Sequence, residues 1–215
     1  MTTAEAIARD LLDVEAVALR PDDPFTWASG RLSPVYTDNR LLLSVPDVRS
    51  RVAHAFFQAL TELATPVDAV SATATAGIPH GALLANRAGL PFSYVRGEAK
   101  GHGRQNRVEG RVEPGQRVVL VEDLVSTGGS VLSAADALDD TGADVVAVLA
   151  VFSYGFAEAE RAFEAAGVPL VTLTDFATLA RAAQETGALG PDAWAVLREW
   201  RDDPAGWSVT RGGAA

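Results

Sequence analysis

The fold class is indicated most strongly by residues 118–130, which read Val118-Val119-Leu120-Val121-Glu122-Asp123-Leu124-Val125-Ser126-Thr127-Gly128-Gly129-Ser130. Its four leading apolar residues predict a buried strand, and the Ser-Thr-Gly-Gly-Ser turn predicts the start of a helix. Open α/β sheets bind ligands beyond the carboxyl ends of their strands, and a glycine-rich turn that opens a helix favours a phosphate. Carboxylates this close to a phosphate would repel it, so Glu122 and Asp123 are interpreted as acceptors for sugar hydroxyls. The expected ligand is a phosphate joined to a ribose.

Short apolar runs alternate with helical patterns on both sides of this stretch. Strands are predicted at 68–73, 92–95, 117–123, 144–152 and 170–173. Helices are predicted at 3–19, 46–63, 79–89, 130–140, 157–166, 176–185 and 191–200, and residues 212–215 are expected to be disordered. Apolar strands that alternate with helices indicate an α/β fold with a mainly parallel five-stranded sheet and helices on both faces.

The composition narrows the class of protein. The chain has 215 residues, 48% hydrophobic and 21% charged, which suits a single globular domain. A net charge of −10 disfavours nucleic acid as a partner, and the absence of cysteine excludes disulfides and thiolate metal sites. The longest apolar run, 145–152, is too short to cross a bilayer, and the first residues lack the pattern of a signal peptide. We therefore expect a cytoplasmic protein without membrane or nucleic-acid partners.

The second informative segment is Tyr94-Val95-Arg96-Gly97-Glu98-Ala99-Lys100-Gly101-His102-Gly103-Arg104-Gln105-Asn106-Arg107-Val108-Glu109-Gly110. It follows a predicted strand, is rich in glycine and concentrates positive charge in an acidic chain, which is typical of a mobile loop that closes over a polyanion. Of 18 basic residues in the chain, Lys100 is the single lysine. Because arginine replaces lysine where only charge matters, Lys100 is a candidate for specific chemistry.

These two segments resemble known motifs. Residues 118–130 resemble the phosphoribosyl diphosphate signature of the type I phosphoribosyltransferases, and 96–103 resembles the catalytic lid of the orotate phosphoribosyltransferases. A third segment, Phe25-Thr26-Trp27-Ala28-Ser29-Gly30-Arg31-Leu32-Ser33-Pro34-Val35-Tyr36-Thr37-Asp38-Asn39-Arg40, resembles the base-binding segment of that family, and 73–80 resembles its diphosphate-side loop. The motifs of Walker A loops, dinucleotide-binding folds and nucleophile elbows do not occur.

The resemblance implies transfer of ribose 5-phosphate from phosphoribosyl diphosphate to orotate, giving orotidine 5′-monophosphate and diphosphate for pyrimidine synthesis. It implies a single domain over 1–215, with a hood at about 1–45 and a mobile lid at 96–111. Lys100, His102 and Asp123 are the implied catalytic residues, and Ser126, Tyr36 and Arg40 the implied orotate contacts. The implied contacts of phosphoribosyl diphosphate are Arg96, Lys100, His102, Glu122, Asp123, Leu124, Val125, Ser126, Thr127, Gly128, Gly129 and Ser130. The resemblance also implies Mg²⁺ held mainly by the substrate rather than by protein ligands, and a homodimer whose lid residues are shared between subunits.

This sequence departs from the family pattern at three places, which leaves two substrate-binding residues unidentified. Many members have a lysine where Ala28 stands, a second basic residue where Gly97 stands, and an arginine near 153–155. The partner of the orotate carboxylate and one diphosphate contact are therefore not assigned. Candidate substitutes are Arg31, Arg40, Arg104 and Arg107. Two alternatives stay open: a phosphoribosyltransferase for a purine or uracil, and a regulator that senses phosphoribosyl diphosphate.

Overall fold

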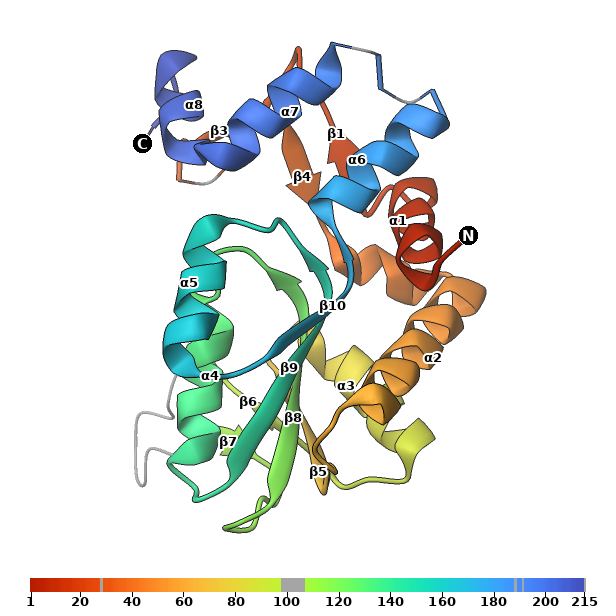
Figure 1. Ribbon diagram of the computed structural model, residues 1–215, viewed down its shortest axis with the longest axis vertical. Helices are drawn as coiled ribbons and strands as arrows, with labels where there is room; N and C mark the ends of the chain where they lie inside the picture. Colours follow the sequence, from red (N-terminus) through yellow and green to blue (C-terminus); the bar gives the residue numbers. More distant parts are fainter. Residues whose placement is uncertain (28, 98–106, 188, 191, 215) are drawn as a thin grey trace.

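The computed structural model describes residues 1–27, 29–97, 107–187, 189–190 and 192–214. Its centre is a six-stranded sheet in the order β10-β9-β8-β5-β6-β7 (Figure 1). The strands are β5 (Ala69–Thr73), β6 (Phe92–Val95), β7 (Val108–Glu109), β8 (Arg117–Val125), β9 (Asp144–Ser153) and β10 (Leu170–Asp175). All pairings are parallel except the antiparallel β6–β7 pair. The predicted mainly parallel sheet is confirmed. The predicted count of five strands is wrong, because the two residues of β7 are too few to form an apolar run.

Helices cover both faces of the sheet, as predicted (Figure 1). On one face lie α1 (Thr3–Asp13), α2 (Pro46–Glu62) and α3 (Gly77–Ala88), and on the other lie α4 (Gly129–Asp139) and α5 (Ala157–Ala166). The central strand β8 contributes side chains to the hydrophobic core on both faces of the sheet, because successive side chains of a strand point to opposite faces. Val119 and Val121 pack with the first group of helices, whereas Val118 and Leu120 pack with the second. No helix in the described part of the chain is long and apolar enough to cross a membrane.

A hood lies beyond the carboxyl ends of the parallel strands (Figure 1). It contains β1 (Val17–Leu19) paired with β4 (Val35–Thr37), the hairpin of β2 (Phe25–Thr26) and β3 (Leu32–Ser33), and the 3₁₀ helix η1 (Asn39–Ser44). The predicted helix at 3–19 is wrong beyond Asp13. Glu15 adopts a positive φ of 58°, which a continuing right-handed helix does not allow, and β1 follows.

The C-terminal segment completes the hood. α6 (Phe176–Glu185) leads to α7 (Ala193–Asp202) and α8 (Pro204–Thr210), which lie beside the N-terminal hairpin (Figure 1). The Ala214 backbone N–H donates to the Gly30 carbonyl at 3.0 Å, and Gly213 N–H donates to the Ser208 carbonyl at 2.9 Å. The prediction of disorder is therefore wrong for 212–214, and Ala215 lies outside the described residues. α8 itself is not predicted from the sequence.

Candidate active site

The two acidic residues of β8 differ in their surroundings. Glu122 is buried, with 7% of its surface exposed, whereas Asp123 is half-buried. The Asp123 backbone N–H donates to Glu122 Oε1 at 2.9 Å. Burial is the main cause that raises the pKa of the Glu122 carboxyl above its ordinary value, and the neighbouring Asp123 side chain raises it further. Glu122 therefore retains its proton more readily than a free carboxyl group does.

The turn after β8 is shaped to receive an anion. Gly128 has a φ of 86°, and a Cβ at this position would lie 3.1 Å from the Phe163 ring. Helix α4 begins at Gly129, and among the described residues no side chain caps its first turn. Thr127, Gly129 and Ser130 are exposed. The first backbone N–H groups of α4 are thus available to a phosphate, as the sequence predicts.

A small cavity of about 80 Å³ lies between this turn and the end of β5. Its lining includes Thr73, Ala74, Arg96, Glu122 and Ser130. The guanidinium of Arg96 lies 3.5 Å from the Glu109 carboxylate at the sheet edge. Arg96, predicted to contact diphosphate, and Glu122, predicted to contact ribose, therefore border the same cavity.

The predicted lid falls mostly outside the described residues. Lys100, His102 and Arg104 all lie within residues 98–106, outside the described part of the chain. Its two ends meet at the sheet edge, where Arg96 N–H donates to the Arg107 carbonyl at 2.8 Å. The Arg107 side chain donates to the Arg96 carbonyl and to the carbonyl and hydroxyl of Ser133, each at 2.9 Å. Arg107 thus joins the lid base to α4, and its guanidinium is engaged by these contacts.

The hood is tied directly to the carboxylate pair. The Asn39 side chain donates through Nδ2 to the Asp123 carbonyl at 2.7 Å. Sequence reasoning gave Asn39 no role, although it belongs to the base-binding segment. The Arg40 guanidinium forms a two-point ion pair with Asp38, at 2.6 and 2.9 Å. Tyr36 is 47% exposed, and its ring lies 5.5 Å from that of Phe25.

The residues directly after β9 belong to an aromatic part of the core. Tyr154 is 3% exposed, stacks on Phe156 at 5.2 Å and meets Trp200 edge-on at 5.5 Å. Its hydroxyl donates to Thr37 Oγ1 at 2.9 Å, which links β9 to the hood. Burial raises the pKa of Tyr154 to about 12. This position therefore supplies a neutral, packed side chain and no cation.

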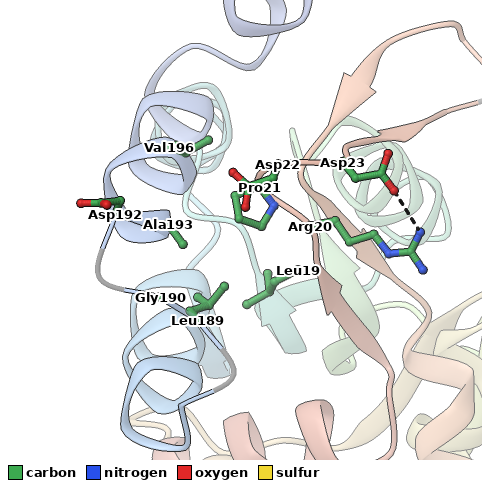
Figure 2. Close-up of a pocket in the computed structure, with 10 residues that line it drawn as sticks. All are labelled: Leu19, Arg20, Pro21, Asp22, Asp23, Leu189, Gly190, Asp192, Ala193 and Val196. Carbon is green, nitrogen blue, oxygen red and sulfur yellow. Dashed lines mark ion pairs between the residues drawn. The ribbon is translucent and has the colours of Figure 1, made fainter.

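Two larger cavities lie beside the hood. One of about 290 Å³ borders Ser126 and Thr127 of the turn and, on the hood, Trp27 and Arg31. The other, of about 530 Å³, lies between the loop of residues 19–23 and α7. Figure 2 shows Leu19 and Pro21 of that loop near Ala193 and Val196, while Arg20 extends toward Asp23.

The larger of these cavities does not suit a phosphorylated ligand. Asp22, Asp23 and Asp192 line it, and its one arginine, Arg20, is paired with Asp23 at 3.9 Å. None of its lining residues belongs to the turn or to the carboxylate pair. The cavity of about 290 Å³, which borders Ser126 and Thr127 of the turn, is therefore the relevant one of these two for the chemistry predicted from the sequence.

The described residues contain no cluster of three or more His, Cys, Asp or Glu side chains arranged to hold a metal ion. Glu122 and Asp123 are the carboxyl groups nearest to the phosphate turn along the chain. Hard oxygen donors of this kind suit Mg²⁺ that keeps most of its coordination for phosphates and water. The donor set thus fits a substrate-held ion.

Comparisons with known proteins identify the family of the chain. Residues 41–171 match the phosphoribosyl transferase domain family. The orotate phosphoribosyltransferases of Streptococcus agalactiae and Streptococcus pneumoniae are each 48% identical over 207 residues, which is 96% of this chain and 99% of theirs. The crystal structure of orotate phosphoribosyltransferase from Aeropyrum pernix is 34% identical with a TM-score of 0.72, covering 86% of this chain and 99% of that one. That from Mycobacterium tuberculosis is 27% identical with a TM-score of 0.67, covering 83% and 99%. On this evidence the chain belongs to the orotate phosphoribosyltransferase family.

Proposed function

We propose that this protein transfers the ribose 5-phosphate of phosphoribosyl diphosphate to N1 of orotate, releasing diphosphate and forming orotidine 5′-monophosphate. The observation that carries this proposal is the end of β8, where two carboxyl groups precede an open phosphate turn. The hood is hydrogen-bonded to the same point through Asn39 and Asp123. Binding sites for a phosphate, a ribose and a base would thus lie next to one another at the carboxyl end of β8.

The phosphoribosyl group is assigned to the turn and the carboxylate pair. The backbone N–H groups of residues 126–130 hold the 5′-phosphate, with the hydroxyls of Ser126, Thr127 and Ser130 as additional donors. Glu122 and Asp123 accept hydrogen bonds from the ribose hydroxyls. The negative charge on the pair also favours the positive charge that develops at the anomeric carbon as the bond to diphosphate breaks.

The diphosphate is assigned to Arg96 and to the lid. Arg96 borders the small cavity beside Glu122, which is where a group leaving the anomeric carbon would depart. Lys100 and His102 neutralise the charge that builds up on the departing diphosphate. Closure of 96–111 then excludes water, so that the sugar cation reacts with orotate rather than being hydrolysed.

Orotate is assigned to the space between the hood and the turn. Ser126 offers a hydroxyl to the base, and the exposed ring of Tyr36 offers a flat surface to the pyrimidine. Arg40 is the third residue assigned to orotate. Its guanidinium would have to leave the ion pair with Asp38 to reach the carboxylate.

Mg²⁺ is the proposed cofactor, held mainly by the diphosphate and the ribose hydroxyls. Asp123 is the half-buried carboxylate available to meet it. When bound, the ion offsets phosphate charge and makes diphosphate a better leaving group.

The assembly and location are also proposals. A homodimer is proposed in which the lid of each subunit reaches the site of its partner. Sedimentation of the purified protein at micromolar concentration tests this, with a mass of twice 22.5 kDa expected. The cytoplasm is proposed as the compartment in which the enzyme meets its substrates.

A competition between free bases tests the proposed function against its rivals. The protein is incubated with phosphoribosyl diphosphate, Mg²⁺ and equal amounts of orotate, uracil, adenine and hypoxanthine, and the nucleotides formed are separated and quantified. Orotidine 5′-monophosphate is the expected product. A different nucleotide would assign another base. Binding of phosphoribosyl diphosphate without any product would favour the sensor.

A further inference from the structure

The cavity beside the turn has the position and size of a base site. It measures about 290 Å³, at the lower end of small-molecule pockets. Ser126 and Thr127 form one side, and the indole of Trp27 lies on the hood side. A planar base attached to a ribose phosphate on the turn would extend in this direction. The distinctive feature of orotate within this space is its carboxylate.

Two other arginines that are candidates for binding that carboxylate, Arg40 and Arg107, already have partners. Residues 153–155, near which the resemblance leads us to expect an arginine, contain the buried Tyr154, whose hydroxyl donates to Thr37. Arg40 is held by both oxygens of Asp38. Arg107 is held by Ser133 and by a backbone carbonyl at the lid base.

Arg31 differs from these residues because its guanidinium is free. Among the described residues, no hydrogen-bond acceptor or carboxylate lies within bonding distance of this side chain, and its Nε is buried without a partner. A buried N–H donor that lacks an acceptor is costly, and such donors are rare in folded proteins. An anionic ligand in the cavity would supply the missing acceptor. A carboxylate matches the fork of a guanidinium through two parallel hydrogen bonds.

The other charges of the cavity are mostly engaged. Arg201 pairs with Asp202 at 3.2 Å, and Asp203 accepts the Gly206 N–H at 2.9 Å as the cap of α8. Arg161 and Glu158 lie on exposed positions of α5. Among the described lining residues, Arg31 is therefore the cation on the hood side that has no carboxylate partner.

The C-terminal segment fixes the hairpin that carries Arg31. The Leu32 N–H donates to Ser208 Oγ at 2.9 Å, and the Ser208 hydroxyl donates to the Ala214 carbonyl at 2.5 Å. The Ala214 N–H donates to the Gly30 carbonyl at 3.0 Å, on the other side of Arg31. Both neighbours of Arg31 are thus bonded to α8 and the residues after it. The guanidinium is attached to a braced loop and not to a free one.

We propose that Arg31 binds the orotate carboxylate and is the residue that distinguishes orotate from uracil. The inference rests on the proposed function, because it assigns a contact within that site. Arg31 is a specificity residue in this account. It contacts the substrate at a group that takes no part in bond formation, so its removal should weaken binding of the carboxylate and leave the phosphoribosyl contacts intact.

The test compares two nucleotides that differ only in this carboxylate. Dissociation constants of orotidine 5′-monophosphate and uridine 5′-monophosphate are measured by calorimetry for the parent protein, Arg31→Ala, Arg31→Lys and Arg198→Ala. Arg198 is an exposed arginine of α7 that does not line the cavity, so it serves as the matched control. Thermal unfolding establishes that each variant is folded.

The parent and Arg198→Ala should prefer orotidine 5′-monophosphate by about 10- to 100-fold, the range expected for hydrogen bonds to a charged group. In Arg31→Ala this preference should fall to within about threefold of unity, with the affinity for uridine 5′-monophosphate unchanged, and Arg31→Lys should retain part of it. An unchanged preference in folded Arg31→Ala would overturn the inference, as would an equal loss for both nucleotides. A parent protein that makes no orotidine 5′-monophosphate would instead overturn the proposed function.

Discussion

Replacement of Glu122 by glutamine should stabilise the protein while it impairs the enzyme. Glu122 is 7% exposed, and burial raises the pKa of its carboxyl from 4.5 to about 8. Glutamine has nearly the same shape and keeps an oxygen that can accept the Asp123 N–H. The substitution therefore removes the ionisable group and preserves the packing.

The sign of the effect follows from proton uptake. Below pH 4.5 the folded and unfolded chains both hold the proton, so the carboxyl makes no pH-dependent contribution. As the pH rises from 4.5 to 8, the unfolded chain loses its proton and the folded chain keeps it, so the parent protein loses stability. At pH 7 this loss is about 2.5 pH units at about 1.4 kcal/mol each, which gives an upper value on the order of 3 kcal/mol.

Glutamine carries no such loss, so its advantage should grow with pH. We expect Glu122→Gln to be more stable than the parent by about 1–3 kcal/mol at pH 7.5 and by less than half of that at pH 5.5. The melting temperature should rise by about 2–4 °C per kcal/mol. At the same time kcat/KM should fall by about 10- to 100-fold, because an amide cannot ionise to offset the positive charge that develops on the sugar.

The assay is thermal unfolding followed by circular dichroism at several pH values between 5.5 and 8.5. Glu164→Gln, an exposed change on α5, is the control and should not reproduce the pH-dependent gain. A Glu122→Gln variant that is less stable than the parent by the same amount at every pH would rule out a protonated Glu122 in the folded protein. That result would mean that the Glu122 carboxyl is ionised and well partnered in the folded protein.

Three further predictions concern the lid, the turn and the C-terminal brace. Lys100→Ala should lower kcat by about 10²–10³-fold with little change in the KM for phosphoribosyl diphosphate, and equal steady-state kinetics would disprove its role. Gly128→Ala should destabilise the fold by about 1–2 kcal/mol and raise the KM for phosphoribosyl diphosphate, because Gly128 has a φ of 86° and an added Cβ would press on Phe163. Chemical denaturation and steady-state kinetics measure these two effects, and a variant unchanged in both would contradict the turn assignment. Ser208→Ala should lower the stability by about 1 kcal/mol and weaken the binding of orotidine 5′-monophosphate more than that of uridine 5′-monophosphate, because the N–H of Leu32, the residue after Arg31, loses its acceptor. Titration with both nucleotides measures the two affinities, and equal weakening of both would contradict this role of Ser208.

Sequence patterns predict the sheet and its helices well because these elements carry strong periodicity. The helices at 157–166 and 176–185 have the predicted bounds, and five strands lie where apolar runs occur. The phosphate turn is also predictable, since its glycines and hydroxyls are contiguous with the carboxylate pair. These features depend on local sequence and on the general rule that ligands bind at the carboxyl ends of parallel strands.

Other features depend on contacts between distant residues, which no local pattern reveals. β7 exists because 108–109 pair with β6, and the C-terminal residues are ordered because Ala214 meets Gly30. The same limit applies to the orotate site. Arg31 and Arg40 are equivalent candidates in the sequence, and only the structure shows that Asp38 engages one of them.

Transfer of the phosphoribosyl group to orotate can be followed directly through the consumption of orotate. Purified protein is mixed with orotate, phosphoribosyl diphosphate and Mg²⁺, and the ultraviolet absorbance of orotate is recorded with and without a chelator. We expect the absorbance to decrease only when phosphoribosyl diphosphate and Mg²⁺ are both present, with orotidine 5′-monophosphate and diphosphate formed in equal amounts. An unchanged absorbance, in folded protein that binds phosphoribosyl diphosphate, would contradict the proposed transfer to orotate.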